Sequence, residues 1–267
     1  MGMGSGSQPV VDPTVGRVLP PGRVEEEVTA VAYGARTVVR PQGDRSGAWP
    51  PDQEILRLER PEDVQELRAL VDRYRAESAG ERVIVGIVGE PGVGKSTLAE
   101  ELVEDLGDDG VLVPLDGFHL SNRILETLVA RGRKGAPDTF DACGFVQLVH
   151  RLRRQTEEVV YAPEYRGDVD EPVAGAIEIP RSTPVVVLEG SYLLLDQHPW
   201  TEVRRCLDAA WYVVVDDEVR LARLAGRHQA LGLYPAAGRR WAQCQAEDNA
   251  RLVRRTRDRA HLLIVTS

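Results

Sequence analysis

The chain has 267 residues, of which 42% are hydrophobic and 28% charged, and its formal net charge is −9. This length allows one large domain or two small ones with a sizeable buried core, and the composition is that of an ordinary globular protein. A protein that binds nucleic acid would carry a basic excess, so the acidic balance argues against that class and fits a soluble enzyme.

Residues 1–54 differ from the rest of the chain, and we treat them as an N-terminal extension of unknown role that is flexible in part. They open MGMGSGSQ and are rich in Gly, Pro, Val and Arg. Their one regular signal is a hairpin pattern over residues 28–40, around Tyr33-Gly34-Ala35. Residues 55–267 are expected to form the functional domain.

From residue 61 to residue 77 the pattern becomes helical. Pro61 suits the first turn of a helix, and the apolar side chains that follow share one face. They are Val64, Leu67, Leu70, Val71 and Tyr74. We expect this helix to pack beside the core and to lead into the first strand.

A strand and a glycine-rich loop follow over residues 83–97, VIVGIVGEPGVGKST. The β-branched run suits a parallel strand buried on both faces. The next eight residues fit the phosphate-loop pattern G-x-x-x-x-G-K-[ST] at every fixed position, and a helix is expected over residues 96–106. The alternative is a glycine-rich turn with a chance lysine, but both the strand and the helix that the motif requires are present.

In this motif, backbone N–H groups surround the phosphates of a nucleotide at a helix N-terminus. Lys95 would reach the β- and γ-phosphates, and the Ser96 hydroxyl would ligate Mg²⁺. We therefore predict a site for a nucleoside triphosphate, with ATP and Mg²⁺ as cofactors. Its residues are Gly89, Glu90, Pro91, Gly92, Val93, Gly94, Lys95, Ser96 and Thr97.

The remainder of the chain alternates strands and helices. Strands are expected over residues 111–115, 159–161, 184–189, 211–215 and 261–265, and helices over 121–131, 143–156, 218–231 and 239–257. Such alternation implies a parallel sheet covered on both faces. We predict an α/β fold of the P-loop NTPase type, in three layers (α/β/α), with a mostly parallel five-stranded sheet and a helical lid over about residues 218–240.

Ligands of such sheets bind beyond the carboxyl ends of the strands, where two acidic residues stand. Asp116 follows the strand VLVPL and could accept the proton of a substrate hydroxyl; the alternative is a turn aspartate before Gly117. Glu189 ends the strand PVVVLE and could hold Mg²⁺ through water or stabilise the phosphate loop. Gly190 after it would leave room for a ligand; the alternative is a solvated glutamate.

Two basic segments are further candidates. The loop RGRKGAPDTFD, residues 131–141, mixes bases, acids, glycine and proline, as binding loops do. Arg220, Arg223 and Arg227 share one face of the predicted lid helix and could neutralise charge on a triphosphate. The alternative for these arginines is ion pairing with nearby acids at the surface.

Together these motifs resemble the group of P-loop kinases that contains phosphoribulokinase, uridine kinase and bacterial pantothenate kinase. The resemblance covers about residues 80–267. Within the group, the sequence is most similar to the "nucleoside/nucleotide kinase" subgroup, which includes fructose-transport-type kinases. The motifs that carry it are GEPGVGKST, LDGFH, RKGAPDTFD, YAPEYRGD, VVVLEGSYLLLD, VVVDDEVRLARLAGRH and DNARLVRRTRDRAHLLIV. The chain departs from true uridine kinases in its DGFH segment and lacks much of the pantothenate kinase pattern.

The resemblance implies roles for individual residues. Asp116 would be the catalytic base, with Lys95, Arg223 and Arg227 acting on the phosphates and Ser96 and Glu189 on the metal. The acceptor side would include Asp116, His119, Arg133, Asp141, Tyr165 and Arg166, with Pro163 and Asn249 nearby. The resemblance also makes a homodimer one expected assembly, because relatives are often dimers.

The acceptor is expected to be a small molecule with a free hydroxyl. Acids are frequent in EYRGDVDE, residues 164–171, which suits a sugar, a nucleoside or an amine-bearing polyhydroxy metabolite if that segment lines the pocket. It could equally be a solvated acidic loop. Other classes that stay open are a pantothenate-type vitamin kinase, a P-loop switch without a small-molecule acceptor and a nucleotide sensor without activity.

Cysteine usage and hydropathy indicate the compartment. Cys143, Cys206 and Cys244 are widely spaced, so free thiols are expected instead of disulfides or a zinc site. The sequence has no apolar run as long as a membrane span and no signal-peptide core. We therefore expect a cytoplasmic protein that binds neither membranes nor nucleic acid.

Overall fold

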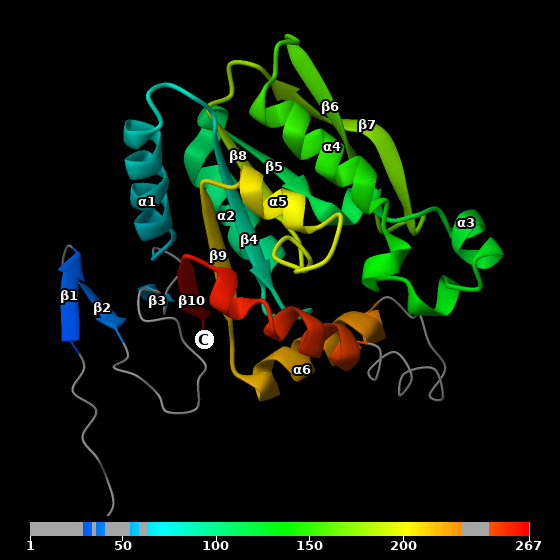
Figure 1. Cartoon of the computed structure of the whole chain (residues 1–267). Helices are drawn as coiled ribbons and strands as arrows, with labels where there is room; N and C mark the ends of the chain where they lie inside the picture. Colours follow the sequence, from blue (N-terminus) through cyan, green and yellow to red (C-terminus); the bar gives the residue numbers. More distant parts are fainter. Residues whose placement is uncertain (1–28, 34–35, 41–53, 59–62, 231–245, 267) are drawn as a thin grey trace, which may run out of the picture.

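The computed structural model describes residues 29–33, 36–40, 54–58, 63–230 and 246–266 of the chain (Figure 1). Its centre is a six-stranded sheet in the order β3-β10-β9-β4-β8-β5, with every neighbouring pair parallel. The strands in that order are Glu54–Leu58, Leu262–Thr266, Ala209–Val214, Val83–Gly89, Val185–Glu189 and Gly110–Pro114.

The expectation of five strands is wrong by one, because β3 forms an additional edge strand. Glu54 lies opposite Leu262 in a parallel pair with β10. Three of its five residues are buried, namely Ile55, Leu56 and Leu58. These side chains are part of the two core clusters on either face of the sheet. The sheet therefore begins at residue 54, before helix α1 and the phosphate loop.

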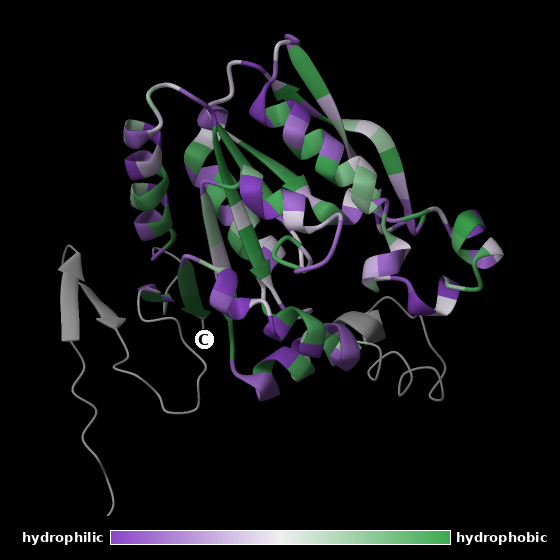
Figure 2. Ribbon diagram, viewed as in Figure 1, coloured by the Kyte–Doolittle hydropathy of each residue, from purple (hydrophilic) through white to green (hydrophobic). Residues whose placement is uncertain are grey.

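Helices cover both faces of the sheet, as expected for three α/β/α layers. On one face, α1 (Val64–Glu77) and α2 (Lys95–Leu106) contact each other and share a core with Val85 and Ile87 of β4. On the other face, α4 (Ala142–Arg153) and α5 (Thr201–Cys206) share a core with Ile84 and Val88 of the same strand. Figure 2 shows the sheet strands mostly apolar and the helices striped, which is the pattern that two-sided burial produces.

The other predicted elements differ from the structure mainly in their ends. The first helix starts at Val64, with Pro61 outside the described residues. The third helix, α3, covers only Asn122–Thr127, because the chain turns away after Leu128. The lid helix α6 is Asp217–Ala230, and a further helix covers residues 246–254. The rest of the predicted lid, residues 231–240, lies outside the described residues.

Two hairpins lie apart from the main sheet. The predicted N-terminal hairpin is present as β1 (Thr29–Tyr33) and β2 (Arg36–Arg40), with Gly34 and Ala35 outside the described residues. The strand expected over residues 159–161 is longer: β6 (Val159–Arg166) pairs antiparallel with β7 (Glu171–Pro180), which the sequence analysis missed. None of the helices among the described residues is long and apolar enough to cross a membrane.

Candidate active site

The phosphate loop joins β4 to α2. Gly92 and Gly94 have φ angles of +88° and +96°, a left-handed conformation that L side chains rarely adopt. These two glycines allow the tight curl that precedes Lys95, the first residue of α2. The loop therefore has the backbone that the motif requires for surrounding an anion.

Lys95 is buried at the centre of this site. Its Nζ donates a hydrogen bond to the backbone oxygen of Glu90 at 3.1 Å and lies 3.8 Å from Oε1 of Glu189. The two side chains are only 9% and 8% exposed. Glu189 reaches Lys95 because β8 lies next to β4, with Glu189 opposite Ile87.

Oxygen atoms suitable for a metal lie around Lys95. Ser96 follows it at an exposed position, and Glu189 provides a carboxylate. Mg²⁺ commonly binds proteins through one or two such oxygens and takes its other ligands from phosphates and water. The pair fits that ion, whereas nowhere in the described part of the chain do three or more His, Cys, Asp or Glu side chains gather as a metal cluster.

Asp116 lies at the same edge of the sheet. Its turn, Leu115–Phe118, follows β5, whose last residue Pro114 pairs with Glu189. The side chain of Asp116 is 49% exposed, so a ligand can reach it. Lys95, Glu189 and Asp116 thus come from three consecutive neighbours, β4, β8 and β5.

Gly190 serves packing instead of ligand access, which corrects the sequence interpretation. A Cβ atom at Gly190 would lie 2.5 Å from Cβ of Leu115. The close approach therefore belongs to the turn that carries Asp116. The missing side chain brings that turn against the end of β8.

His119 packs beside Asp116. Its Nδ1 lies 2.9 Å from the backbone oxygen of Asp116 and 3.8 Å from Oδ1 of the same residue. Its ring makes tilted contacts with the rings of Phe140 and Tyr165, at centroid distances of 4.0 and 5.1 Å. Burial lowers the pKa of His119 although the charge of Asp116 opposes this shift, so the imidazole is held mainly neutral at pH 7.

The β6–β7 hairpin approaches the Asp116 turn closely. A Cβ at Gly117 would lie 2.2 Å from the backbone oxygen of Pro163. The backbone of β6 therefore lies directly on this turn. Pro163 and Tyr165, two residues expected near the acceptor, are brought to the site in this way.

Asp170 fastens the tip of this hairpin to the loop of residues 131–134. Its carboxylate accepts a short hydrogen bond from the Tyr165 hydroxyl and pairs with Lys134 at 3.2 Å and Arg131 at 3.1 Å. Burial, followed by the hydrogen bond to Asp170, raises the pKa of Tyr165. Neither Lys134 nor Asp170 was predicted as a site residue, because their pairing joins segments 36 residues apart.

Three of the predicted acceptor residues are engaged in local contacts. Arg133 forms a two-pronged pair with Asp138 at 2.9 and 2.6 Å, and Arg166 pairs with Asp168. Asp141 caps α4 by accepting a hydrogen bond from the backbone N–H of Gly144 at 2.8 Å. These contacts give no support to an acceptor role, which remains a prediction for these residues.

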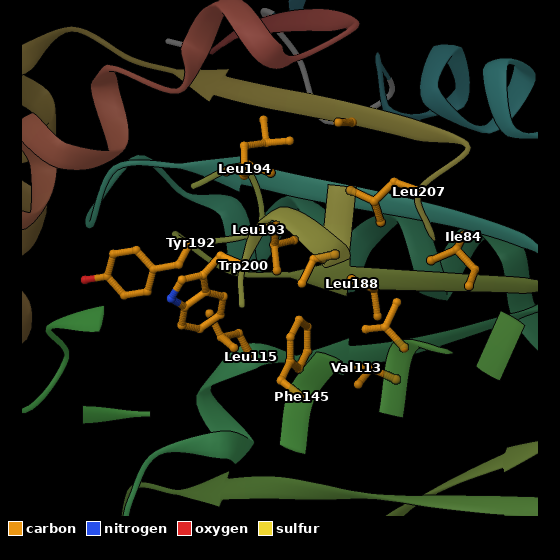
Figure 3. Packing of buried hydrophobic residues seen from close by; sticks show 14 of the residues in the cluster. Ile84, Val113, Leu115, Phe145, Leu188, Tyr192, Leu193, Leu194, Trp200 and Leu207 are labelled. Carbon is orange, nitrogen blue, oxygen red and sulfur yellow. The ribbon is translucent and has the colours of Figure 1, made fainter. Parts of the chain in front are cut away.

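One backbone carbonyl oxygen of the loop of residues 131–141 accepts two hydrogen bonds from side chains that are distant in the sequence. The backbone oxygen of Gly135 accepts hydrogen bonds from the Tyr192 hydroxyl and, at 3.2 Å, from Nδ2 of Asn249. Figure 3 shows Tyr192 at the rim of the core with its hydroxyl directed away from Leu188 and Val113. The sequence analysis missed Tyr192, because SYLLLD reads as a purely apolar core segment.

The lid helix rests on the phosphate loop. A Cβ at Gly92 would lie 2.7 Å from Cγ of Leu224, and Nη1 of Arg223 donates to the backbone oxygen of Val93 at 3.4 Å. Arg223 thus lies beside the phosphate site as predicted from the lid motif. Arg220 differs from it, since its side chain is 2% exposed and belongs to an internal ion cluster. The side chain of Arg227 lies outside the described residues.

Asp170→Asn is expected to lower the free energy of unfolding by about 1–2 kcal/mol, because Lys134 and Arg131 lose the charge that pairs them. Asparagine suits the left-handed φ of +55° at this position, so the loss would report on the charge and on the acceptor oxygen that asparagine lacks, without added backbone strain. Urea unfolding measures the difference. Asp168→Asn, on the exposed pair at the same hairpin tip, is the control and should change it by less than about 0.5 kcal/mol; equal losses would contradict the assignment.

Comparison with known proteins finds a family profile and related sequences that match this chain. The profile described as "Phosphoribulokinase / Uridine kinase family" matches residues 84–264. The "Putative uridine kinase C227.14" of Schizosaccharomyces pombe is 36% identical over 162 residues, which cover 57% of this chain and 69% of that protein. The Aspergillus versicolor "ATP-dependent kinase-like protein notR'" is 37% identical over 128 residues, covering 45% of this chain and 74% of that protein.

Two solved structures share the fold. The crystal structure of a "putative fructose transport system kinase" from Silicibacter sp. TM1040 has a TM-score of 0.68 and 35% identity, covering 75% of this chain and 98% of that one. YFH7 from Saccharomyces cerevisiae, a P-loop-containing protein, has a TM-score of 0.65 at 20% identity, covering 77% and 99%. The second likeness concerns the fold alone.

Proposed function

The chain belongs to the phosphoribulokinase / uridine kinase family of P-loop kinases, and on this premise we propose that it transfers the γ-phosphoryl group of ATP to a hydroxyl of a small polyhydroxy metabolite. One observation carries this proposal. Lys95, Glu189 and Asp116 stand at the carboxyl ends of three adjacent strands, so groups suited to bind phosphate, metal and a hydroxyl proton share one edge.

The phosphates would be held by the loop and by Lys95. The ammonium group of Lys95 lies 3.1 Å from a loop carbonyl, a contact that phosphate oxygens can replace. Arg223, which already contacts Val93, adds a second positive charge beside the loop. Ser96 and Glu189 would hold Mg²⁺, which neutralises phosphate charge when bound.

The proton of the acceptor hydroxyl would pass to Asp116. As the acceptor oxygen forms its bond to the γ-phosphorus, the bond from that phosphorus to the bridging β,γ-oxygen breaks, and ADP leaves. Asp116 is held for this role by its turn, in which Leu115 packs on Gly190 at the end of β8 and Gly117 lies against the backbone of Pro163 in the hairpin. The largely neutral His119 adds no full charge to compete for Asp116.

Charge pairing favours a neutral acceptor. Two of the four acids of residues 164–171 are paired with cations: Asp168 with Arg166, and Asp170 with Lys134 and Arg131. Glu171 accepts hydrogen bonds from the backbone N–H of Asn122. Because the charges of Asp168 and Asp170 are compensated, they give little reason to expect an amine-bearing acceptor. A sugar or a nucleoside, whose recognition needs hydrogen bonds more than charge, fits better.

Water must be kept from the γ-phosphate, since an open site would hydrolyse ATP. The contact of Leu224 with Gly92 and that of Arg223 with Val93 bring α6 over the loop. A lid helix in this place is suited to closing the donor side. We also propose magnesium as the metal and the cytoplasm as the compartment, where ATP and reduced thiols occur together.

ATP consumption measured against a library of sugars, nucleosides and vitamins tests the proposal. We expect at least one polyhydroxy compound to raise consumption about 10-fold or more over the acceptor-free rate, within the range of general-base catalysis. Pantothenate as the active compound would redirect the proposal to a vitamin kinase. Rapid hydrolysis that no compound accelerates would indicate a nucleotide switch instead.

A further inference from the structure

Glu90, the second residue of the phosphate loop, directs its carboxylate into an ion cluster. Nε of Arg254 donates to its Oε1 at 2.9 Å, and Nη2 donates to its Oε2 at 2.6 Å. Nε of Arg220 lies 3.5 Å from the same Oε2. With a side chain only 10% exposed, Glu90 depends on these two arginines for charge compensation.

The arginines in turn are held by two further acids. Arg220 donates from Nε to Asp217 at 2.9 Å and from Nη2 to Glu247 at 2.8 Å. Arg254 also contacts Asp217, at 3.2 Å. We call these five residues, Glu90, Asp217, Arg220, Glu247 and Arg254, the ionic brace.

The ionic brace joins three elements. Glu90 comes from the phosphate loop, Asp217 and Arg220 from α6, and the other two from the helix of residues 246–254. Figure 1 shows α6 and this C-terminal helix together at the end of the sheet where β4 finishes. The phosphate loop is thus fixed from outside by two helices that are far from it in the sequence.

Burial makes these pairs different from ordinary surface pairs. Exposed ion pairs contribute little, but the side chain of Glu90 is only 10% exposed and that of Arg220 only 2%, whereas that of Arg254 is 41% exposed. When one partner of such a pair is removed, the other is left as an uncompensated buried charge and the local structure must change. The Glu90 hydrogen bonds and charge raise the pKa of Arg254, which agrees with a tight pair.

The position of Glu90 has a direct consequence for Lys95. The backbone oxygen of Glu90 accepts a hydrogen bond from the Lys95 ammonium. The side-chain carboxylate of Glu90 accepts two hydrogen bonds from Arg254. The place of the loop backbone next to Lys95 therefore depends on an arginine that comes from the helix of residues 246–254. Since the free energy of phosphate binding depends on how much of the population has the competent loop shape, a looser loop binds more weakly.

We propose that Arg254, supported by Arg220, is a positioning residue that holds the phosphate loop in its ATP-binding shape through Glu90. The inference rests on the proposed ATP site. Arg254 itself need not touch the nucleotide. Its effect on the Kd of MgATP should depend on the carboxylate of Glu90, so replacing Arg254 should change the Kd no further once Glu90 has been replaced by glutamine.

A double-mutant cycle on MgATP binding, measured by isothermal titration calorimetry, tests this. Arg254→Met and Glu90→Gln are each expected to raise the Kd of MgATP about 10-fold, which corresponds to a competent fraction near one tenth. Because both act through one pair, the double variant should also be weaker by about 10-fold. Independent actions would multiply to about 100-fold, and that result would overturn the proposal.

Controls separate positioning from general damage. Arg251→Met removes an arginine of the same helix that is 65% exposed and 3.6 Å from Asp248, and it should leave the Kd within about 2-fold. Arg254→Lys keeps the charge and should recover part of the loss. Circular dichroism melting shows whether each variant is folded. Should Arg254→Met fail to fold, Glu90→Gln and Arg254→Lys decide, and wild-type affinity in both would reject the brace.

The result for the unmodified chain distinguishes the two proposals. Absence of MgATP binding by the wild-type protein would remove the ATP site and the proposed function together. Binding by the wild type with unchanged affinity in Arg254→Met would remove the brace alone. The kinase proposal would then stand on Lys95, Glu189 and Asp116 as before.

Discussion

Asp116→Asn is expected to lower turnover about 100-fold or more while the Kd of MgATP stays within about 2-fold of the wild-type value. Asparagine has the shape of aspartate, so the turn between Leu115 and Phe118 should be kept. It has no carboxylate to accept the hydroxyl proton, so only the chemical step should suffer. Turnover is measured as the steady-state kcat with the acceptor that the library identifies. The Kd of MgATP is measured by calorimetry.

Asp72→Asn is the matched control for this experiment. Asp72 lies on α1, is 51% exposed and pairs with Arg68 one helical turn away. Its replacement should leave kcat and the Kd of MgATP unchanged. Near-normal turnover by Asp116→Asn would exclude Asp116 as the base and would direct attention to His119, its buried neighbour.

Lys95→Met should have a larger effect, with turnover falling about 1000-fold and the Kd of MgATP rising about 10-fold or more. Methionine has a similar length but no charge, so the phosphates lose their central cation, and losing one preorganised donor costs 10²–10³ in rate. Single-turnover measurements at saturating ATP separate the loss in binding from the loss in chemistry.

Stability has to be followed in this variant, because Lys95 lies 3.8 Å from the buried carboxylate of Glu189. Adding Glu189→Gln removes the unpaired charge, so the double variant should regain stability without regaining turnover. Arg205→Met, at a pair whose arginine is 74% exposed, controls for loss of a cation at the surface. Turnover within 10-fold of wild type in folded Lys95→Met would contradict the assigned phosphate site.

The phosphate loop could be predicted from the sequence because all of its determinants are local. The β-branched run, the glycines and Lys95 follow one another without a break, and β4, the loop and α2 occur as expected. All of the parallel strands except β3 were also predicted, since burial on both faces produces continuous apolar runs. Order in the sheet then brings Asp116 and Glu189 to the same edge.

Features that depend on pairing over a long distance could not be predicted in the same way. Strand β7 contains two prolines and is mostly exposed, so its alternation is weak, and only its partner β6 makes it a strand. In the sequence, nothing distinguished Asp170 from the other acids of the segment EYRGDVDE. Its importance arises from Lys134 and Arg131, which lie more than 35 residues away.

Arg220 and Arg223 show the limit most clearly. They are three residues apart on one helix face, and the sequence offered both the same two roles. In the structure Arg223 contacts the loop backbone, whereas Arg220 is enclosed by Glu90, Asp217 and Glu247. Only the way α6 packs on the loop distinguishes Arg223, which contacts the loop backbone, from Arg220, which is buried in the ion cluster.

The edge strand β3 has a consequence for how the chain may be shortened. Its backbone pairs along the whole of β10, from Leu262 to Thr266. A version of the protein that began at β4 would keep every residue of the kinase motifs and yet leave the outer N–H and C=O groups of β10 unpaired. Such an open edge is a template for joining strands of other molecules. Residues 54–58 therefore cover this edge of β10, although they belong to none of the kinase motifs.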